Sequence, residues 1–535
     1  MYRHVSPCNG DPEDPGYSDE KLASKINEAF VSVMHNYSPL ADDVCVPTDD
    51  DEPIEVTVTA VTQKLRQISI TRASGPDNLP NWVLKEYAEI LAPAITDILN
   101  HSFRDCKVPR VWKIADVPPV PKAPTISDFN KGLRPISLTS TLSKVAEDFV
   151  IEHELKPVLL KSIDPLQFGF IPGSCTTFAL ISMLHHWLAA TDRTGTTVRV
   201  ALLDFRKAFD LVDHNLLIAK LFSYGIKPHV VNWIADFLRG RSQRVKINKE
   251  CCSAFLQVPA GIPQGTKIGP WLFLLMINDL SIAGPISSRM WKFADDTTLC
   301  EVVPRDDISK LQDMVQQVAD WSSNNMFQLN ATKCKELRIN FSKQKSDVDL
   351  VISNEQCFEL VTSAKILGVT VTDDLKWNAH VNNIVLKASK RLYLLRLLKR
   401  TDLDVKSLIQ FYCTCIRSIL EYACQTFHSS LPQYLSDDIE RIQKRALRII
   451  FPDLHYNEAL ESARLTTLCA RREELCMKLF SSIEEDSQHK LRHLLPEPNT
   501  SCYNFRTARK YQLPKINTKR YLKSFIPFCA AQATL

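Results

Sequence analysis

The 535-residue chain lacks the features that would place it in or across a membrane. Its apolar run at residues 271–277 is far too short to span a bilayer, and Asn278 and Asp279 follow it directly. Its first residues contain no apolar core of the kind that a secretory signal needs. We therefore expect an intracellular protein, nuclear or cytoplasmic, that is not secreted and does not bind a membrane.

The chain also lacks the cysteine spacing that is typical of a zinc site. Its 16 cysteines are scattered: Cys251 and Cys252 are adjacent, whereas Cys413 and Cys415 are two apart with no second pair nearby. Because there is no export signal, we expect reduced thiols rather than disulfides. No internal repeat occurs at a fixed period either, so a repeat architecture is not indicated.

Charge is unevenly distributed along the sequence. Residues 1–60 carry 3 Lys+Arg against 13 Asp+Glu, a net charge of −10, so the remaining residues carry +14 of the overall +4. An acidic leader on a basic body is typical of a protein that binds a polyanion. It also fits an ordinary enzyme with a disordered arm. We expect residues 1–60 to be a largely flexible leader with one helical patch at 20–33.

Strand and helix patterns alternate between residues 197 and 375. The β-rich apolar run at 197–205 predicts a strand that ends at Asp204. Residues 289–302 predict two short strands joined by a turn at Asp295 and Asp296. Beyond residue 376 the strand signals fade, and helices are expected to dominate.

An amphipathic helix is expected after the second of these strands. Residues 306–323 carry one apolar stripe at helical spacing, and Asp306 or Asp307 is positioned to cap the helix. The predicted stripe consists of Ile308, Leu311, Val315 and Val318.

Three carboxylates in this region predict a metal site. Adjacent aspartates in an apolar setting repel each other, and burial makes their charges costlier. Strands that pair in one sheet can bring Asp204 beside Asp295 and Asp296 across 91 residues of sequence. Mg²⁺ takes oxygen ligands, and two such ions about 4 Å apart stabilise an in-line phosphoryl displacement. Taken alone, however, adjacent aspartates more often mark a solvated turn.

Three motifs give these carboxylates a family context. The segments "LLDFRKAFD", "GIPQGTKIGPWLFLLMINDL" and "FADD" occur in this order. Together they resemble the palm motifs of the reverse transcriptases of non-long-terminal-repeat retrotransposons, most closely the jockey-like groups. The resemblance implies an RNA-directed DNA polymerase of the α+β class. Its shape would be the right-hand polymerase, with fingers, a palm of antiparallel sheet plus helices, and a helical thumb.

The resemblance also implies domains and partners. The flanking segments "WKIADVPPVPK" and "LRPISL" resemble parts of the fingers. We expect fingers at 61–200, a catalytic palm at 201–375, a helical thumb and connection at 376–490, and a basic tail at 491–535. The expected partners are an RNA template, a DNA primer and deoxynucleoside triphosphates. The oligomeric state is not indicated.

Specific roles follow from the same resemblance. Asp204, Asp295 and Asp296 would be the catalytic ligands of two Mg²⁺ ions, which Mn²⁺ can replace, and Lys333 would be a general acid toward pyrophosphate. Phe209 would exclude a 2′-hydroxyl. The nucleotide-binding set is Arg134, Lys122, Phe205, Phe209, Gln264 and Gly265.

Nucleic-acid contacts are expected toward the C-terminus. The block containing Leu367 and Gly368 resembles the one that grips the primer end. Residues 437–450 form a two-faced helix with an apolar stripe of Ile439, Ile442, Ala446 and Ile449. Its other face holds Arg441, Lys444, Arg445 and Arg448, which suits a phosphate backbone and equally a solvated helix.

The basic tail carries no carboxylate beyond residue 503 and alternates cations with aromatics. It could bind RNA by charge and stacking, or be disordered. The aromatic residues in question are Tyr503, Phe505, Tyr511 and Tyr521.

Two other functions fit parts of the pattern. An RNA-dependent RNA polymerase also uses carboxylates spaced like Asp204 and Asp210, but the bulky Phe209 and the Pro-Gln-Gly turn weigh against it. A catalytically silent, retroelement-derived nucleic-acid-binding protein is the second alternative. Relatives in this family usually carry an endonuclease domain before the polymerase, whereas a short acidic leader stands here, so we expect no endonuclease. We also expect no ribonuclease H.

Overall fold

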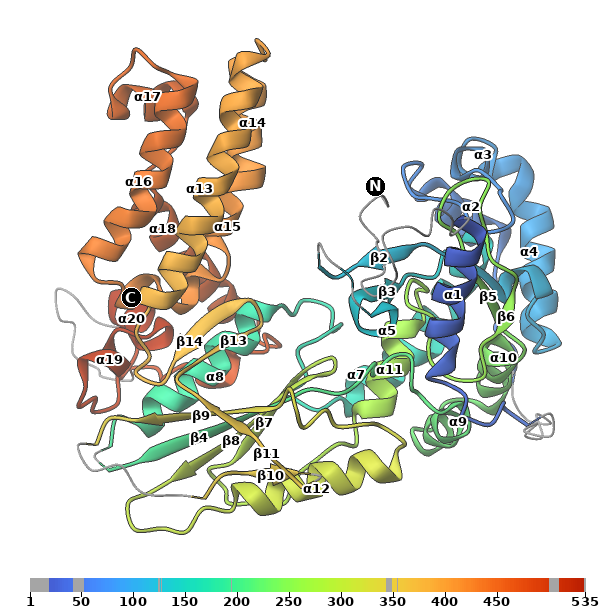
Figure 1. Cartoon of the computed structure of the whole chain (residues 1–535), viewed down its shortest axis with the longest axis horizontal. Coiled ribbons are helices and arrows are strands. Elements are labelled where there is room, and N and C mark those ends of the chain that lie inside the picture. Colours follow the sequence, from blue (N-terminus) through green and yellow to red (C-terminus); the bar gives the residue numbers. More distant parts are fainter. Residues whose placement is uncertain are drawn as a thin grey trace, which may run out of the picture. The chain divides into compact units, whose positions relative to one another are not determined.

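The computed structural model describes residues 19–41, 52–123, 126, 128–193, 195–342, 349–353, 355–499 and 510–533. Helices and strands are mixed along the chain, which confirms the α+β class. The chain divides into two compact units and passes from one to the other five times. Unit 1 consists of residues 1–164, 205–281 and 319–329, and unit 2 of residues 165–204, 282–318 and 330–535. Figure 1 labels the elements of both units.

Unit 1 combines helices with two small sheets. In the first sheet, β5 (Ser242–Val245) pairs in parallel with β1 (Ile114–Val117) and antiparallel with β6 (Leu256–Gln257). In the second, β2 (Pro119–Pro121) and β3 (Leu133–Pro135) are antiparallel. Its helices are α1 (Asp19–Ser32), α2 (Val58–Arg66), α3 (Asn81–Glu86), α4 (Ala88–Arg104), α5 (Phe129–Gly132), α6 (Thr141–Val150), α7 (Lys156–Ser162), α9 (His214–Ser223), α10 (Pro228–Leu238) and α11 (Gly269–Ile277).

Helix α1 belongs to the core of unit 1. It carries acidic residues in its first turn, where they favour the helix dipole, and it buries Ile26 and Phe30. The buried Asn27 amide donates to Ala254 O at 3.0 Å and to Ser253 Oγ at 3.1 Å. Residues 19–41 of the expected flexible leader are therefore part of the fold. Residues 1–18 and 42–51 lie outside the described residues.

Unit 2 is built on a five-stranded sheet in the order β12-β9-β4-β8-β7. The central strand β4 (Thr197–Leu203) is antiparallel to both neighbours, β8 (Asp296–Val303) and β9 (Lys335–Asn340). The outer strands are β7 (Arg289–Phe293) and β12 (Glu359–Val361). Helix α8 (Thr176–Ala190) packs on one face, and the first turns of α12 (Leu311–Asn324) lie on the other (Figure 1).

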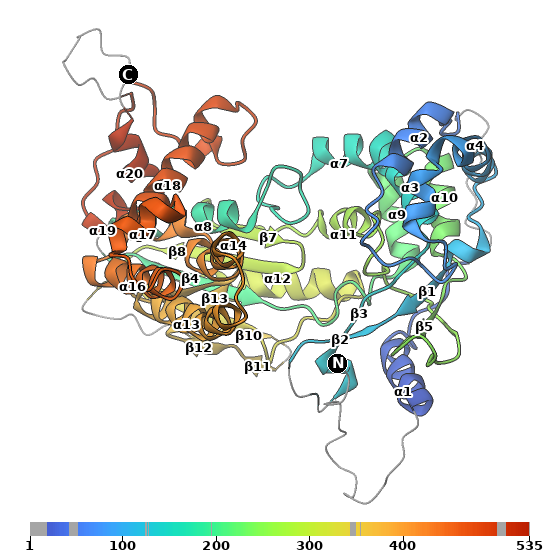
Figure 2. The same ribbon diagram turned by 90° about the horizontal axis from the view of Figure 1, so that it is seen from above.

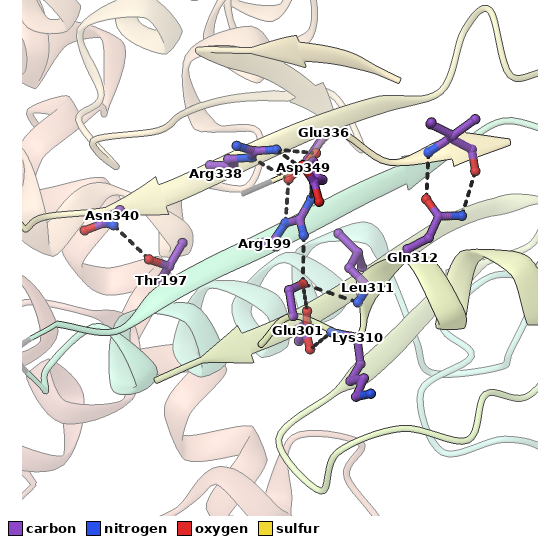
Figure 3. A network of polar contacts seen from close by, with 12 residues as sticks. Thr197, Arg199, Glu301, Lys310, Leu311, Gln312, Glu336, Arg338, Asn340 and Asp349 are labelled. Atoms are coloured by element: carbon purple, nitrogen blue, oxygen red, sulfur yellow. Dashed lines mark hydrogen bonds and ion pairs between the residues drawn. The ribbon is translucent and has the colours of Figure 1, made fainter. Parts of the chain in front are cut away.

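A network of buried charges crosses the middle of this sheet (Figure 3). Arg199 of β4 donates from Nε to Glu336 Oε1 on β9 at 2.7 Å, and Arg338 donates to the same oxygen at 2.7 Å. Arg199 also donates to Ser309 Oγ at 2.7 Å, and Ser309 donates in turn to Glu301 of β8. Despite burial, which raises it, these donors hold the pKa of Glu336 below its ordinary value. The network ties three strands to the turn before α12.

The start of α12 corrects the sequence prediction. The helix begins at Leu311, because Glu301 accepts the Lys310 amide at 2.6 Å and Ser309 Oγ accepts the Leu311 amide at 3.3 Å. The capping prediction for Asp306 or Asp307 is therefore wrong, and the predicted stripe residue Ile308 is 86% exposed. The buried stripe consists of Leu311, Met314, Val315 and Val318.

Helices dominate the rest of unit 2, as expected. Two short hairpins precede them, and α13 and α16 run side by side (Figures 1 and 2). None of the described helices combines the length and apolar character needed to cross a bilayer. The elements are β10 (Ile352–Ser353), β11 (Gln356–Cys357), β13 (Ser363–Ile366), β14 (Val369–Thr372), α13 (Asn378–Arg400), α14 (Val405–Phe411), α15 (Ser418–Glu421), α16 (Gln433–Ile450), α17 (Tyr456–Ala463), α18 (Leu468–Glu485), α19 (Lys519–Leu522) and α20 (Phe525–Gln532).

The last described segment, residues 510–533, packs into the core of unit 2. Tyr511 is 6% exposed and donates to Glu484 Oε1 at 2.7 Å, and Tyr521 is 9% exposed. Asp192, which follows α8, accepts the Thr518 amide at 2.8 Å. The predicted role of Tyr511 and Tyr521 in stacking on RNA is wrong, because both rings are buried. Tyr503 and Phe505 lie outside the described residues.

Candidate active site

A two-residue turn in unit 2 carries two of the predicted catalytic carboxylates. The β7–β8 ladder closes at the pair Phe293–Asp296, which leaves Ala294 and Asp295 as the turn. This confirms the expected strand–turn–strand. Ala294 has φ +56, the left-handed conformation that glycine adopts easily and that costs other residues about 1 kcal/mol.

Asp204 reaches the same end of the sheet from β4. The β4–β8 ladder ends at the pair Leu203–Thr297, so Asp204 follows its strand where Asp296 begins the partner strand. Asp204 and Asp295 are half-buried, and Asp296 is exposed. The predicted convergence of the three aspartates is therefore present within unit 2.

The three carboxyl groups influence the ionisation of Asp296. The pKa of Asp296 is raised to about 6, first because the surrounding protein desolvates its carboxyl group and then because Asp295 and Asp204 repel its charged form. The cluster would be stabilised by a cation.

Two protein groups beside Asp204 orient it. Asn330 donates from Nδ2 to Asp204 Oδ2 at 2.9 Å, and its amide donates to Asp204 O at 2.7 Å. Lys333 Nζ lies 3.9 Å from Asp204 Oδ2 with its side chain 70% exposed. The structure thus brings Lys333 to the carboxylates, whereas its role as an acid stays a prediction. Sequence reasoning missed Asn330, although it lies within the quoted "NNMFQLNATKC".

The donor chemistry of this cluster fits a hard divalent cation. Its carboxylate oxygens are the ligands that Mg²⁺ prefers, and their mutual repulsion is what such a cation relieves. Among the described residues, no group of three or more His, Cys, Asp or Glu side chains is arranged to hold a metal ion. A bound ion would therefore take further oxygen donors from outside the protein, such as water or phosphate.

In unit 1, the predicted Gln264 loop packs against the strand segment that follows Arg134. Ser137 donates from its amide to Gln264 O at 2.7 Å, and a Cβ at Gly265 would lie 2.4 Å from Ser137 O. Because Gly265 also has φ +129, no other residue fits there without strain. Arg134 is exposed on β3, and Lys122 is bonded to the same hairpin through Gly132 O.

The first palm motif continues in unit 1 with Phe209 and Asp210. The Phe209 ring stacks on Phe273 of α11 with ring centroids 4.1 Å apart and an interplanar angle of 15°. Asp210 is buried and accepts a hydrogen bond from Gln264 Nε2 at 2.8 Å. Burial raises the pKa of Asp210, which the bond from Gln264 opposes. Asp210 therefore fixes Gln264 rather than facing solvent.

Phe205 has a core position in unit 1. It is 5% exposed and lies against Trp321 and Phe327, with ring centroids 6.5 and 5.8 Å away. Its ring is therefore not accessible to a nucleotide, which corrects the nucleotide-binding assignment of this side chain.

A basic groove lies beside the β13–β14 hairpin of unit 2. The hairpin turns at Leu367 and Gly368, both with positive φ, and Tyr422 donates to Leu367 O at 2.7 Å. None of the described residues that line the groove is a carboxylate. Its cationic lining residues are Lys365, Lys387, Lys390 and Arg391.

Helix α16 has the two faces that its sequence predicts. Ile439, Ile442 and Ala446 are buried, and Ile449 is half-buried. The four predicted basic residues are all exposed, although Arg441 forms an ion pair with Asp438 at 2.9 Å. The other three are Lys444, Arg445 and Arg448.

Residues 120–371 match the protein family described as reverse transcriptase (RNA-dependent DNA polymerase). A second, shorter match covers residues 377–418 and is described as the N-terminal region of alkylated DNA repair protein alkB homolog 8. The three palm motifs lie inside the first match. Its boundaries span both the Arg134 hairpin and the Leu367 turn.

Several curated proteins align with most of the chain. It is 23% identical to the RNA-directed DNA polymerase from mobile element jockey of Drosophila melanogaster, over 95% of this chain and 56% of that protein. It is 27% identical to the probable RNA-directed DNA polymerase from transposon X-element of the same species, over 76% and 44%. The corresponding protein from transposon BS is 25% identical, over 80% and 48%. The chain spans about half the length of these relatives.

Among solved structures, apo telomerase from Candida tropicalis, truncated from its C-terminal domain, aligns with 50% of this chain and 55% of its own. The alignment has a TM-score of 0.33 and 12% sequence identity.

Proposed function

We propose that this chain, whose residues 120–371 match the reverse transcriptase family and which is similar to the jockey polymerase, extends a DNA primer on an RNA template. The observation that carries the proposal is the gathering of Asp204, Asp295 and Asp296 at one end of the sheet, inside the matched region. In this proposal the sheet of unit 2 is the palm of a right-hand polymerase, and α13–α18 supply the thumb.

The carboxylates would bind two Mg²⁺ ions, or Mn²⁺ in their place. When bound, such ions lower the pKa of the primer 3′-hydroxyl and offset charge on the triphosphate. Asn330 holds one oxygen of Asp204, so the other remains free to bind. Lys333, exposed and near Asp204, would give a proton to the departing pyrophosphate.

The nucleotide would be recognised by residues of unit 1. Arg134 and Lys122 share one hairpin, and a guanidinium fork suits phosphate oxygens. Phe209, held flat against Phe273, would leave no room for a 2′-hydroxyl. Gln264 has its amide nitrogen engaged by Asp210, so its carbonyl oxygen is the end available to a nucleotide.

The duplex would lie along the basic surfaces of unit 2. Lys365, Lys387, Lys390 and Arg391 line a groove without acidic groups beside the Leu367 turn, which suits a phosphate backbone. The basic face of α16 adds a second set of cations.

Primer extension tests the proposal directly. The purified protein would be given an RNA template, a DNA primer, deoxynucleotides and Mg²⁺, beside Asp295→Asn. We expect extension by the wild type and none by the variant, with equal binding of the duplex. A wild type that binds the duplex and never extends it, with Mg²⁺ or Mn²⁺, would support the catalytically silent alternative.

Nucleotide choice separates the proposal from an RNA polymerase. The burial of Asp210 beneath Gln264 already disfavours a contact with ribose. The wild type should reject ribonucleotides, and Phe209→Val should accept them more readily because it opens the sugar pocket. Equal use of both nucleotide types by the wild type would remove Phe209 from this role.

A further inference from the structure

The turn that carries the catalytic aspartates is bordered by a segment that runs beside β7. In this segment, residues 165–169, Leu166 O accepts the Lys292 amide at 2.9 Å, and the Phe168 amide donates to Lys292 O at 2.8 Å. This is the start of a parallel ladder, with Gln167 paired to Lys292. The next rung would use the amide of Ala294.

At Ala294 the hydrogen-bond acceptor is a side-chain oxygen instead of a main-chain carbonyl. Gln167 Oε1 accepts the Ala294 amide at 3.1 Å and the Gly169 amide at 2.9 Å. Gln167 is 1% exposed, so water does not compete for this oxygen. Gly169 lies directly against the turn, because a Cβ there would be only 2.2 Å from the Ala294 nitrogen. Glycine at 169 and an accepting side chain at 167 are thus two parts of one arrangement.

The conformation of Ala294 gives this bond its importance. Ala294 has φ +56, and such strain persists only where the surroundings hold the residue in place. One buried hydrogen bond is of the same order as that strain. The next two residues are Asp295 and Asp296, so a relaxed Ala294 would reorient both carboxylates.

Gln167 is itself held from the C-terminal part of unit 2. Lys490 donates from Nζ to Gln167 O at 2.5 Å and to Pro165 O at 3.3 Å, and lies 5.2 Å from the ring centroid of Phe168. The segment beside β7 is therefore fixed on both sides.

We propose that Gln167 is a positioning residue that holds the Ala294 turn, and with it Asp295 and Asp296, in the arrangement that receives the divalent cations. This inference rests on the proposed function for its catalytic consequence. Its structural part, the restraint of the turn by the amide oxygen of Gln167, is independent of any activity.

The structural part is tested by hydrogen exchange in the metal-free protein. Gln167→Met removes the accepting oxygen and keeps an unbranched side chain. We expect faster exchange in peptides that cover residues 289–299, whereas Gln167→Glu, which keeps an accepting oxygen, should retain the protection. Unchanged exchange in Gln167→Met would overturn the proposal.

Gln443→Met is the matched control. Gln443 is equally buried in unit 2 and accepts a hydrogen bond from Tyr412 at 2.7 Å. The described partners of its side chain all lie between residues 412 and 466, away in sequence from the β7–β8 turn. This variant should lower the melting temperature and leave exchange at 289–299 unchanged. An equal increase in the exchange rate at 289–299 in both variants would mean that the whole fold had loosened, and would also overturn the proposal.

The catalytic part is tested by the Mg²⁺ dependence of extension. Gln167→Met should raise the Mg²⁺ concentration for half-maximal rate by about tenfold to a hundredfold, as for other residues that orient metal ligands. If Gln167→Met does not fold, Lys490→Met should give a smaller rise in exchange at 289–299, and its absence counts against the proposal. A wild type that protects the turn but never extends a primer would refute the proposed function and leave the restraint standing.

Discussion

Strands β4 and β8 carry charged side chains at two places, five residues apart on each strand. In the middle, Arg199 faces Glu301 within one network. Its buried Glu336 accepts from two guanidinium groups at 2.7 Å, and Glu301 accepts from the Ser309 hydroxyl and the Lys310 amide. At the end, Asp204 and Asp296 gather with Asp295, and Lys333 approaches no closer than 3.9 Å. The same sheet therefore provides partners for the carboxylates in its interior and gathers three aspartates at one end of its strands.

The difference has a physical cause. A carboxylate buried without a partner costs several kcal/mol, so the interior is stable only if each carboxylate meets a cation or hydrogen-bond donors. At the ends of the strands, which solvent reaches, carboxylates that repel one another are tolerated, and a bound cation relieves the repulsion. The negative charge at the strand ends therefore favours binding of a cation from solution. Substitutions there should reduce activity, whereas substitutions in the middle of the sheet should reduce stability.

The largest expected effect is on catalysis. Under the proposed function, Asp204→Asn should reduce primer extension by a factor on the order of a thousand or more, because a proposed metal ligand is lost. Glu336→Gln, in the middle network, should retain the rate per folded molecule. The measurement is single-turnover extension, normalised to the folded fraction. Equal losses of extension rate in both variants would contradict the distinction between a catalytic strand end and a structural middle network.

Stability should respond in the reverse sense. Glu336→Gln leaves Arg199 and Arg338 without their shared carboxylate and should cost about 3–5 kcal/mol of unfolding free energy. Asp204→Asn removes repulsion and should leave the stability of the metal-free protein equal or higher. Denaturant unfolding in the presence of a chelator would measure both. A large loss in Asp204→Asn would mean that the aspartate cluster is structural.

The pH dependence should also have opposite signs. The pKa of Asp296 is raised to about 6 in the folded protein, above its ordinary 3.8, so the folded state binds the extra proton between these values. The metal-free protein should therefore lose stability as pH rises through about 6, and Asp296→Asn should remove this step. Glu336, whose pKa is lowered, should lose its contribution as pH falls through its folded pKa. Melting curves in chelator from pH 4 to 8 would separate the two.

The smallest expected effect concerns positive charge. On α16, Arg441 is paired with Asp438, whereas no ion pair of Arg445 occurs among the described residues. Arg445→Ala should reduce the salt slope of duplex binding by about one, and Arg441→Ala by less, because its charge is already partly neutralised. Binding titrations at several salt concentrations would measure this. Unaltered slopes in both would leave α16 as a solvated helix.

Sequence patterns predicted the parts of the site that local chemistry determines. The strand pattern of residues 289–302 predicted the turn at Asp295. The end of the apolar run at 197–205 predicted that Asp204 lies at the end of a strand. Helical spacing separated the buried from the exposed face of α16. These signals depend on neighbours within a few residues, which a sequence displays directly.

The residues that hold the site were not predictable in this way. Gln167 bonds to Ala294 across 127 residues, and Asn330 to Asp204 across 126. A single amide side chain has no period, so nothing local distinguishes it from a surface residue. The same limit explains Tyr511 and Tyr521, because a ring beside cations suits RNA and a protein core equally well.

The alternation of the chain between the two units has a consequence for its synthesis. A ribosome must have released residue 329 before unit 1 possesses all of its segments. Unit 2 can be completed only later in synthesis, because Phe525 and Cys529 of α20 are buried in the same core as residues of α8. The strands of the unit 2 sheet therefore leave the exit tunnel long before α20, which completes the burial of that core. We expect chaperones to shield that apolar surface meanwhile, and a message cut short before α20 to yield an aggregation-prone product.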